Sequence, residues 1–183
     1  MKKDASKLMT EEKFWTIIEE SDRGRKLKES LTSLSEEELF GFRYWWEYFC
    51  KLSYKQELWA VAYVVLGGCS DDGFDYFRFW LIAQGREVFY NALENADTLC
   101  DVFSELEDPE GEDYPEQEDL DYAVQTVLGE RTGDGDYFYA AAEDYSLPGY
   151  ADGIEIEWEE DNEESIRKVC PLTFDKWWGN DVF

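Results

Sequence analysis

The 183-residue chain contains no histidine, four cysteines and only 17 basic side chains against 44 acidic ones. The absence of histidine excludes Ser-His and Cys-His catalysis and also metal sites that depend on histidine ligands. Cys50, Cys69, Cys100 and Cys170 are widely spaced and form no Cys-x-x-Cys pair, a pattern typical of free thiols in a reducing compartment. An enzyme built from this chain would have to use carboxylates, Cys, Lys, Arg or Tyr.

Long apolar segments are also missing. No run approaches the roughly 18 apolar residues that a membrane-spanning helix needs, and the chain starts Met-Lys-Lys-Asp without an apolar leader. We therefore expect a cytoplasmic protein that does not bind a membrane.

The shortage of basic residues is confined to one part of the chain. Residues 1–93 carry 16 acidic and 13 basic side chains, residues 94–164 carry 26 and one, and residues 165–183 carry two and three. Nearly all of the net charge of −27 therefore lies in the middle segment. Such a segment repels nucleic acid and attracts cations, so we expect a basic protein partner and no direct binding of nucleic acid. An acidic surface that serves only solubility is the simpler alternative.

Apolar side chains recur every three or four residues along several stretches, which predicts amphipathic helices. A capping box, Ser35 to Glu38, opens a helix over about 36–51, and further helices are expected over about 56–66, 71–85 and 118–129. With 44% hydrophobic and 17% aromatic residues, the chain has ample material for a core. We predict a mainly α fold, a compact helical domain with about five to seven helices.

Composition divides the chain into three parts. Residues 1–104 are predicted to form the helical core domain, although residues 1–9 are polar and expected to be loose. Residues 105–119 are rich in acidic residues, proline and glycine and almost devoid of apolar side chains, which predicts an acidic linker. Residues 120–183 are expected to form an acidic helix and a partly irregular tail that packs back on the core and holds at most a short hairpin.

The most distinctive candidate site lies where a Gly-Gly turn leads into an apolar helix. Asp71, Asp72 and Asp75 begin this helix and could bind a divalent cation or act as acid and base. Helix capping and an ion pair between Asp75 and Arg78 account for the same residues, and we favour that structural interpretation. Arg78 and Gln84 lie on an otherwise apolar helix, so each needs a polar partner if buried, although the arginine could also bind an anionic ligand. We predict no metal and no cofactor.

Two further groups are candidates for contact with a partner protein. The aromatic side chains Trp45 and Tyr48 lie off the apolar stripe of their helix, and Trp and Tyr are enriched at interface hot spots. Acidic residues also alternate with Ile154, Ile156 and Trp158 in the expected tail. They are Glu155, Glu157 and Glu159, and Glu160 follows directly.

Three motifs resemble a bacterial family, domain of unknown function 4240. They are Phe14-Trp15-x-Ile17-Ile18, Trp59-x-x-Ala62-Tyr63 and, as the most specific, Gly67-Gly68-Cys69-Ser70-Asp71-Asp72-Gly73-Phe74-x-x-Phe77-Arg78-x-Trp80-Leu81-Ile82-x-Gln84-Gly85-Arg86. The resemblance covers about residues 10–105, whereas the aromatic stretch 42–49 departs from it. It implies a small, mostly helical cytoplasmic domain and brings no established activity or catalytic residues.

The leading interpretation is a non-enzymatic interaction protein whose acidic surface binds a basic partner, as an immunity or inhibitor protein does, or as a regulator that imitates a polyanion. The alternative is a ligand-binding or enzymatic domain with a pocket around Gly67 to Gly85. A purely structural subunit is a third class. The sequence leaves the oligomeric state open.

Overall fold

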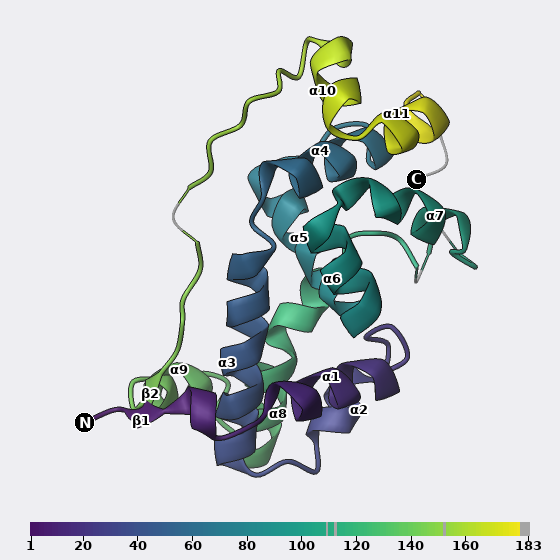
Figure 1. Ribbon diagram of the computed structural model, residues 1–183. Helices are drawn as coiled ribbons and strands as arrows, with labels where there is room; N and C mark the ends of the chain where they lie inside the picture. The colour runs from purple at the N-terminus through teal and green to yellow at the C-terminus, as the bar shows by residue number, and fades with distance from the viewer. Residues whose placement is uncertain (109, 112, 152, 180–183) are drawn as a thin grey trace.

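The computed structural model describes residues 1–108, 110–111, 113–151 and 153–179 (Figure 1). Within these residues the protein is mainly helical, with eleven α-helices and one pair of two-residue strands. The predicted fold class is thus confirmed, but the expected number of helices was too low. Several of the additional helices contain only five to seven residues, which is too short for a hydrophobic period to emerge from the sequence.

The elements follow one another along the chain with short connections in the first part. This part contains β1 (Lys3–Asp4), η1 (Ala5–Lys7), α1 (Glu11–Glu20), α2 (Leu27–Leu31), α3 (Glu36–Leu52), α4 (Gln56–Val65), α5 (Asp71–Ala83), α6 (Arg86–Glu94), η2 (Ala96–Thr98) and α7 (Leu99–Ser104). The second part contains η3 (Glu118–Tyr122), α8 (Ala123–Thr132), α9 (Tyr137–Ala142), β2 (Tyr145–Ser146), α10 (Glu163–Val169) and α11 (Pro171–Trp177). No helix in the described part of the chain has the length and apolar character needed to cross a membrane.

Helix α5 lies in the interior, in contact with α1, α3, α4 and α6. The Trp80 ring stacks on Phe103 of α7 with the ring centroids 5.5 Å apart. On another side of the helix, Phe79 approaches Trp46 of α3 at 5.8 Å. Rings therefore pack on more than one face of α5, which is typical of a helix that is apolar all round.

Local signals explain where α5 begins and ends. The Ser70 hydroxyl caps the helix by accepting a hydrogen bond from the backbone N–H of Gly73 at 3.2 Å. Gly68, before the helix, has a φ of 131°, and Gly85, between α5 and α6, has a φ of 95°. Side-chain-bearing residues rarely adopt these values, so glycine at both positions lets the chain turn into and out of the buried helix.

The C-terminal helices α10 and α11 dock on α4, and α11 also contacts α7. The docking is fixed by Asp97 of η2, whose carboxylate accepts hydrogen bonds from the backbone N–H groups of Leu172 and Thr173, both at 2.8 Å. The N-terminus of α11 is thus capped by a buried carboxylate of the core and not by the residue that precedes the helix. The tail is more ordered than expected, because helices replace the predicted irregular structure at residues 163–169 and 171–177.

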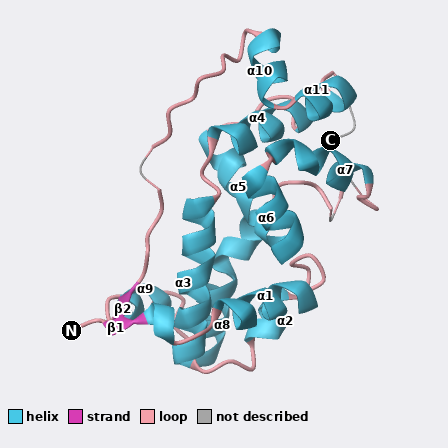
Figure 2. Cartoon of the chain, viewed as in Figure 1, coloured by secondary structure: helices cyan, strands magenta, loops and turns pink. Residues whose placement is uncertain are grey.

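A segment without helix or strand, residues 147–151 and 153–162, joins the two ends of the molecule and is called the strap (Figure 2). Near its start, the Gly149 N–H donates a hydrogen bond to Oε2 of Glu47 on α3 at 2.9 Å. Near its end, the Trp158 indole N–H donates to the Gln56 carbonyl at 3.1 Å, and its ring packs 5.3 Å from Tyr63. The strap is therefore attached to the helices at both ends.

The predicted acidic linker, residues 105–119, is attached to the core at one carboxylate. The side chain of Asp113 is 1% exposed and pairs with Arg23 and Arg25, at 3.4 Å and 2.5 Å, in the loop after α1. The division of the chain into a core, a linker and a tail at this segment stays a prediction.

The two strands join segments that lie far apart in the sequence. β1 pairs in parallel with β2, Lys3 opposite Tyr145 and Asp4 opposite Ser146. The described part of the tail thus contributes one strand whose partner comes from the N-terminal segment, and this agrees with the expectation of at most a short hairpin there. The N-terminal residues are also not loose throughout, since Ala5 and Met9 are buried in the core.

Candidate functional site

The predicted site residues of α5 differ in exposure: Arg78 is buried, Asp75 and Gln84 are partly buried, and the other two are exposed. Asp71 and Asp72 are exposed beside the Ser70 cap, where their charge favours the positive end of the helix. Gln84 lies at the other end of α5 and donates to the Trp80 carbonyl at 3.1 Å, so it satisfies its need for a partner within its own helix. The five candidates of α5 do not converge on one point.

The predicted ion pair between Asp75 and Arg78 is confirmed. The guanidinium of Arg78 is buried, donates to the Cys50 carbonyl as well, and lies over the rings of Tyr54 and Phe74, 4.7 Å and 5.1 Å from their centroids. These contacts link α5 to the end of α3 and to the loop between α3 and α4. Arg78 thus acts within the fold rather than at a surface open to an anionic ligand.

A small cavity of about 160 Å³ opens beside the exposed first turns of α5, and we call it the acidic cleft. It is lined by Asp72, Asp75, Tyr76, Phe79, Glu118, Asp121, Tyr122 and Tyr150. The first four come from α5 and share one helix face, the next three come from η3, and the last comes from the strap. The η3 wall is held against α5 by a hydrogen bond from the Gln117 N–H to the Tyr76 carbonyl at 3.1 Å.

A buried polar cluster lies behind the Asp121 and Tyr150 wall of the acidic cleft. The Arg43 guanidinium donates to Glu47 at 2.7 Å, to Asp121 at 2.9 Å and to the Tyr150 hydroxyl at 2.7 Å. Trp46 donates its indole N–H to the same Asp121 carboxylate at 3.0 Å. The cluster therefore ties α3, η3 and the strap together through one arginine.

The electrostatic balance keeps this cluster charged. Burial alone would lower the pKa of Arg43, but Asp121, Tyr150 and Glu47 together raise it above its ordinary value. Burial and the Asp121 carboxylate raise the pKa of Tyr150, against the opposing effect of Arg43. Arg43 therefore stays protonated and Tyr150 stays neutral at physiological pH.

Sequence reasoning missed Arg43, Glu47, Asp121 and Tyr150. One signal was available, because Arg43 and Glu47 are four residues apart on an aromatic-rich helix, where a paired arginine and carboxylate share a face. No such signal exists for Asp121 and Tyr150, which the chain brings in from distant segments.

The partner-contact candidates lie outside the acidic cleft. Trp45 is half-buried and donates to the Met9 carbonyl at 2.9 Å, whereas Tyr48 is 39% exposed on the outer face of α3. The glutamates of the strap are exposed, and none of them forms an ion pair with a described residue; they are Glu155, Glu157, Glu159 and Glu160.

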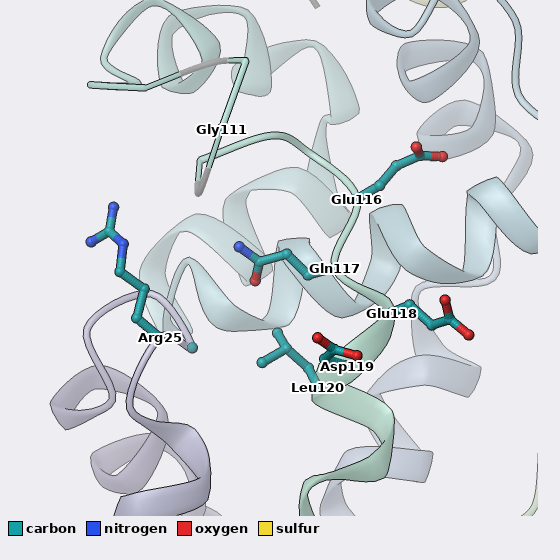
Figure 3. Close-up of a pocket in the computed structure, with 8 residues that line it drawn as sticks. Arg25, Gly111, Glu116, Gln117, Glu118, Asp119 and Leu120 are labelled. Carbon is teal, nitrogen blue, oxygen red and sulfur yellow. The ribbon is translucent and has the colours of Figure 1, made fainter.

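A larger cavity, of about 490 Å³, separates the loop after α1 from the segment before α8. Figure 3 shows Gln117 extending toward the Arg25 side, whereas Glu116 and Glu118 extend the other way. Arg25 is already paired with Asp113, and burial raises the pKa of the Glu116 carboxyl on the other side of this cavity.

Neither a reactive thiol nor a metal-binding group is found near the Gly-Gly turn in the described part of the chain. Burial, with Glu116 and Asp71 nearby, raises the pKa of the Cys69 thiol to about 12, so the thiol stays protonated at neutral pH. Within the described residues, no three carboxylates or thiols are grouped so that they could hold a metal ion.

Comparison with known proteins identifies a family for this fold. Residues 9–128 match the family model described as Protein of unknown function (DUF4240). The chain belongs to this family. The match runs from the residue before the α1 cap into α8, and so contains every acidic-cleft residue except Tyr150, while the strap and the C-terminal helices lie beyond it. No curated protein and no solved structure matches the chain.

Proposed function

We propose that this DUF4240 protein is a non-enzymatic interaction protein that binds a basic partner through its acidic surface. An immunity or inhibitor protein that covers a cationic effector acts in this way, and so does a regulator that imitates a polyanion. The observation that carries the proposal is the state of the strap glutamates, which are exposed and unpaired with cations among the described residues.

Other acidic residues of the same segment differ from the strap glutamates. Asp97, Asp113 and Asp121 are largely buried, and each accepts hydrogen bonds that hold distant parts of the chain together. The fold therefore explains those carboxylates without a partner. The strap glutamates are less fully explained. Glu157 accepts a hydrogen bond from the Gln56 amide at 3.3 Å and Glu159 accepts one from Asn162 at 3.4 Å, but both are exposed and neither pairs with a cation among the described residues. A dispersed arrangement would reduce the mutual repulsion of the four glutamates.

The second candidate function is a ligand-binding or enzymatic domain with its pocket near Gly67 to Gly85. The acidic cleft favours this candidate, because Asp72 and Asp75 of that motif line it. Its small volume and its surplus of carboxylates favour a cationic group as the ligand, so both candidates point to a positively charged counterpart.

The proposal is tested by isolating the partner from native extract at low salt and measuring association with the purified protein. Because exposed charge mainly raises the association rate, replacing the four strap glutamates by glutamine should slow association, with a smaller effect on dissociation. Association should also fall steeply when the salt concentration rises from about 50 to 500 mM.

A matched variant distinguishes an effect of the position of the strap glutamates from an effect of the protein's net charge. The substitutions Glu12→Gln, Glu19→Gln, Glu20→Gln and Glu29→Gln remove the same charge from exposed sites in the near-neutral part of the chain. Equal slowing by both variants, or an affinity that is indifferent to salt, would contradict the proposal and leave the pocket near the Gly-Gly turn as the hypothesis to pursue.

A further inference from the structure

Tyrosine rings form an exposed surface around the acidic cleft. Tyr122 and Tyr150 are 46% and 45% exposed, although both line the cleft. Tyr122 also lines a neighbouring hollow together with Tyr139, which is 58% exposed. Tyrosine is enriched at the energetic centres of protein interfaces, because its ring is large and rigid and its hydroxyl tolerates water. This surface is therefore suited to contact with another protein.

The size of the acidic cleft restricts what can enter it. Its volume is about 160 Å³, whereas pockets for cofactors and drug-sized ligands start at about 300 Å³. A nucleotide or a folded segment does not fit in such a space. The end of a single long side chain does.

The charge of the cleft selects a cation. Two of its four carboxylates already have an arginine partner, since Asp75 pairs with Arg78 and Asp121 pairs with Arg43. The other two, Asp72 and Glu118, form no ion pair with any described residue. A cation that enters the cleft meets these two carboxylates and the aromatic rings that line it. A carboxylate attracts positive charge, and so does the face of an aromatic ring.

We propose that the acidic cleft receives an arginine side chain of the basic partner. The planar guanidinium stacks on aromatic rings and bonds carboxylates with two parallel N–H groups, which the compact ammonium of lysine does not do. The protein holds its own Arg43 by the same chemistry next to the cleft. That guanidinium bonds Asp121 and lies 5.5 Å from the Phe138 ring centroid and 5.9 Å from that of Tyr150.

This inference rests on the proposed function, which it extends by naming the partner group and its site. Calorimetric titration with a hexa-arginine and a hexa-lysine peptide at about 50 mM salt tests it, because the two probes carry equal charge and differ in the shape of the cation. We expect the arginine peptide to bind the wild-type protein more tightly than the lysine peptide.

Variants then locate the bound arginine. Asp72→Asn and Tyr122→Leu should each weaken binding of hexa-arginine by about threefold or more, through loss of one carboxylate or one ring. Asp71→Asn is the control for the first, since Asp71 lies in the same exposed helical turn but outside the cleft. Tyr90→Leu is the control for the second, because Tyr90 is 36% exposed on α6 and lies outside the cleft. Both controls should change the affinity much less.

The outcomes separate the two proposals. Equal affinity for the two peptides, or equal effects of Asp71→Asn and Asp72→Asn, would overturn the arginine site. If only the variant with four glutamines in the strap weakens binding, the acidic surface binds basic partners but the cleft does not hold an arginine. If neither the cleft variants nor the strap variant changes the affinity, both proposals are wrong.

Discussion

The first 93 residues and the acidic segment 94–164 use their carboxylates differently. In the first region acidic and basic side chains are nearly balanced, and ion pairs such as Lys13 with Glu38 join neighbouring helices. In the second region carboxylates outnumber cations 26 to one, so they must find partners elsewhere or remain unpaired. A few aspartates bond arginines or backbone N–H groups of other segments, and the glutamates of the strap stay exposed.

This difference shows that the acidic residues of one segment lie in two structural environments. Its buried aspartates belong to the fold, while its exposed glutamates are available to a partner. Net charge alone does not separate the two groups. The following predictions distinguish the two groups by how much a substitution changes the stability of the protein, and they run from the largest expected effect to the smallest.

The largest effect belongs to the aromatic core. Trp80→Ala removes a ring that is 1% exposed and stacked on Phe103, so we expect a loss of about 3–5 kcal/mol in the free energy of unfolding. Chemical denaturation measures it. Tyr139→Ala, at a 58% exposed position, is the control and should change stability by less than about 0.5 kcal/mol. An unchanged midpoint for Trp80→Ala would show that the ring is not part of the core.

An intermediate effect is expected for a buried aspartate of the acidic segment. Asp97→Ala removes the cap of α11, which should cost about 0.5–2 kcal/mol. It should also speed protease cleavage in the strap, because α10 and α11 detach more readily. Asp101→Ala, at an exposed position of α7, is the matched control. If both variants behaved alike, Asp97 would not differ from the exposed acids of its segment.

A smaller effect, confined to low pH, is expected in the near-neutral region. The Lys13 ammonium and the Ser35 cap lower the pKa of Glu38 from 4.5 to about 2. Because the pKa is lower in the folded state, the stabilisation is complete above about pH 4.5 and is lost as the pH falls toward 2. Glu38→Gln should flatten the stability profile in that window, and Glu12→Gln should not. A Glu38→Gln profile that keeps the wild-type slope between pH 4.5 and 2 would show that Glu38 does not contribute to it.

The smallest effect belongs to the strap. Replacing Glu155, Glu157, Glu159 and Glu160 by glutamine should leave the midpoint of thermal unfolding nearly unchanged or slightly raised, because the change removes repulsion and breaks no ion pair among the described residues. Circular dichroism measures it. A loss comparable with that of Asp97→Ala would mean that these glutamates serve the fold, and the comparison between buried and exposed acids would fail.

Local signals made much of the helical core predictable. The capping box at Ser35, the Ser70 cap, the turn at Gly85 and the family motif all act within a few residues of the chain, and the structure contains them. The short helices α10 and α11 were missed, because one of them depends on a cap supplied by Asp97 from another segment. Long-range partners of this kind leave no periodicity in the sequence.

The candidate site was predictable only in part, for the same reason. The motif pointed to Asp72 and Asp75, which do line the acidic cleft. The opposite wall comes from η3 and the strap, and the cluster behind it depends on Arg43 of α3. Only the three-dimensional path of the chain brings these groups together.

The parallel pairing of β1 with β2 has a consequence for synthesis of the protein on the ribosome. Lys3 and Asp4 are translated before the helical core, whereas their partners Tyr145 and Ser146 follow only after most of that core has been made. Pairing the two strands in an unfolded chain has a high entropic cost, because it closes a long loop. The pairing becomes favourable only once the intervening helices have folded and shortened the distance between β1 and β2. We therefore expect the N-terminal strand to remain unpaired on the nascent chain and to join the fold among the last of its contacts.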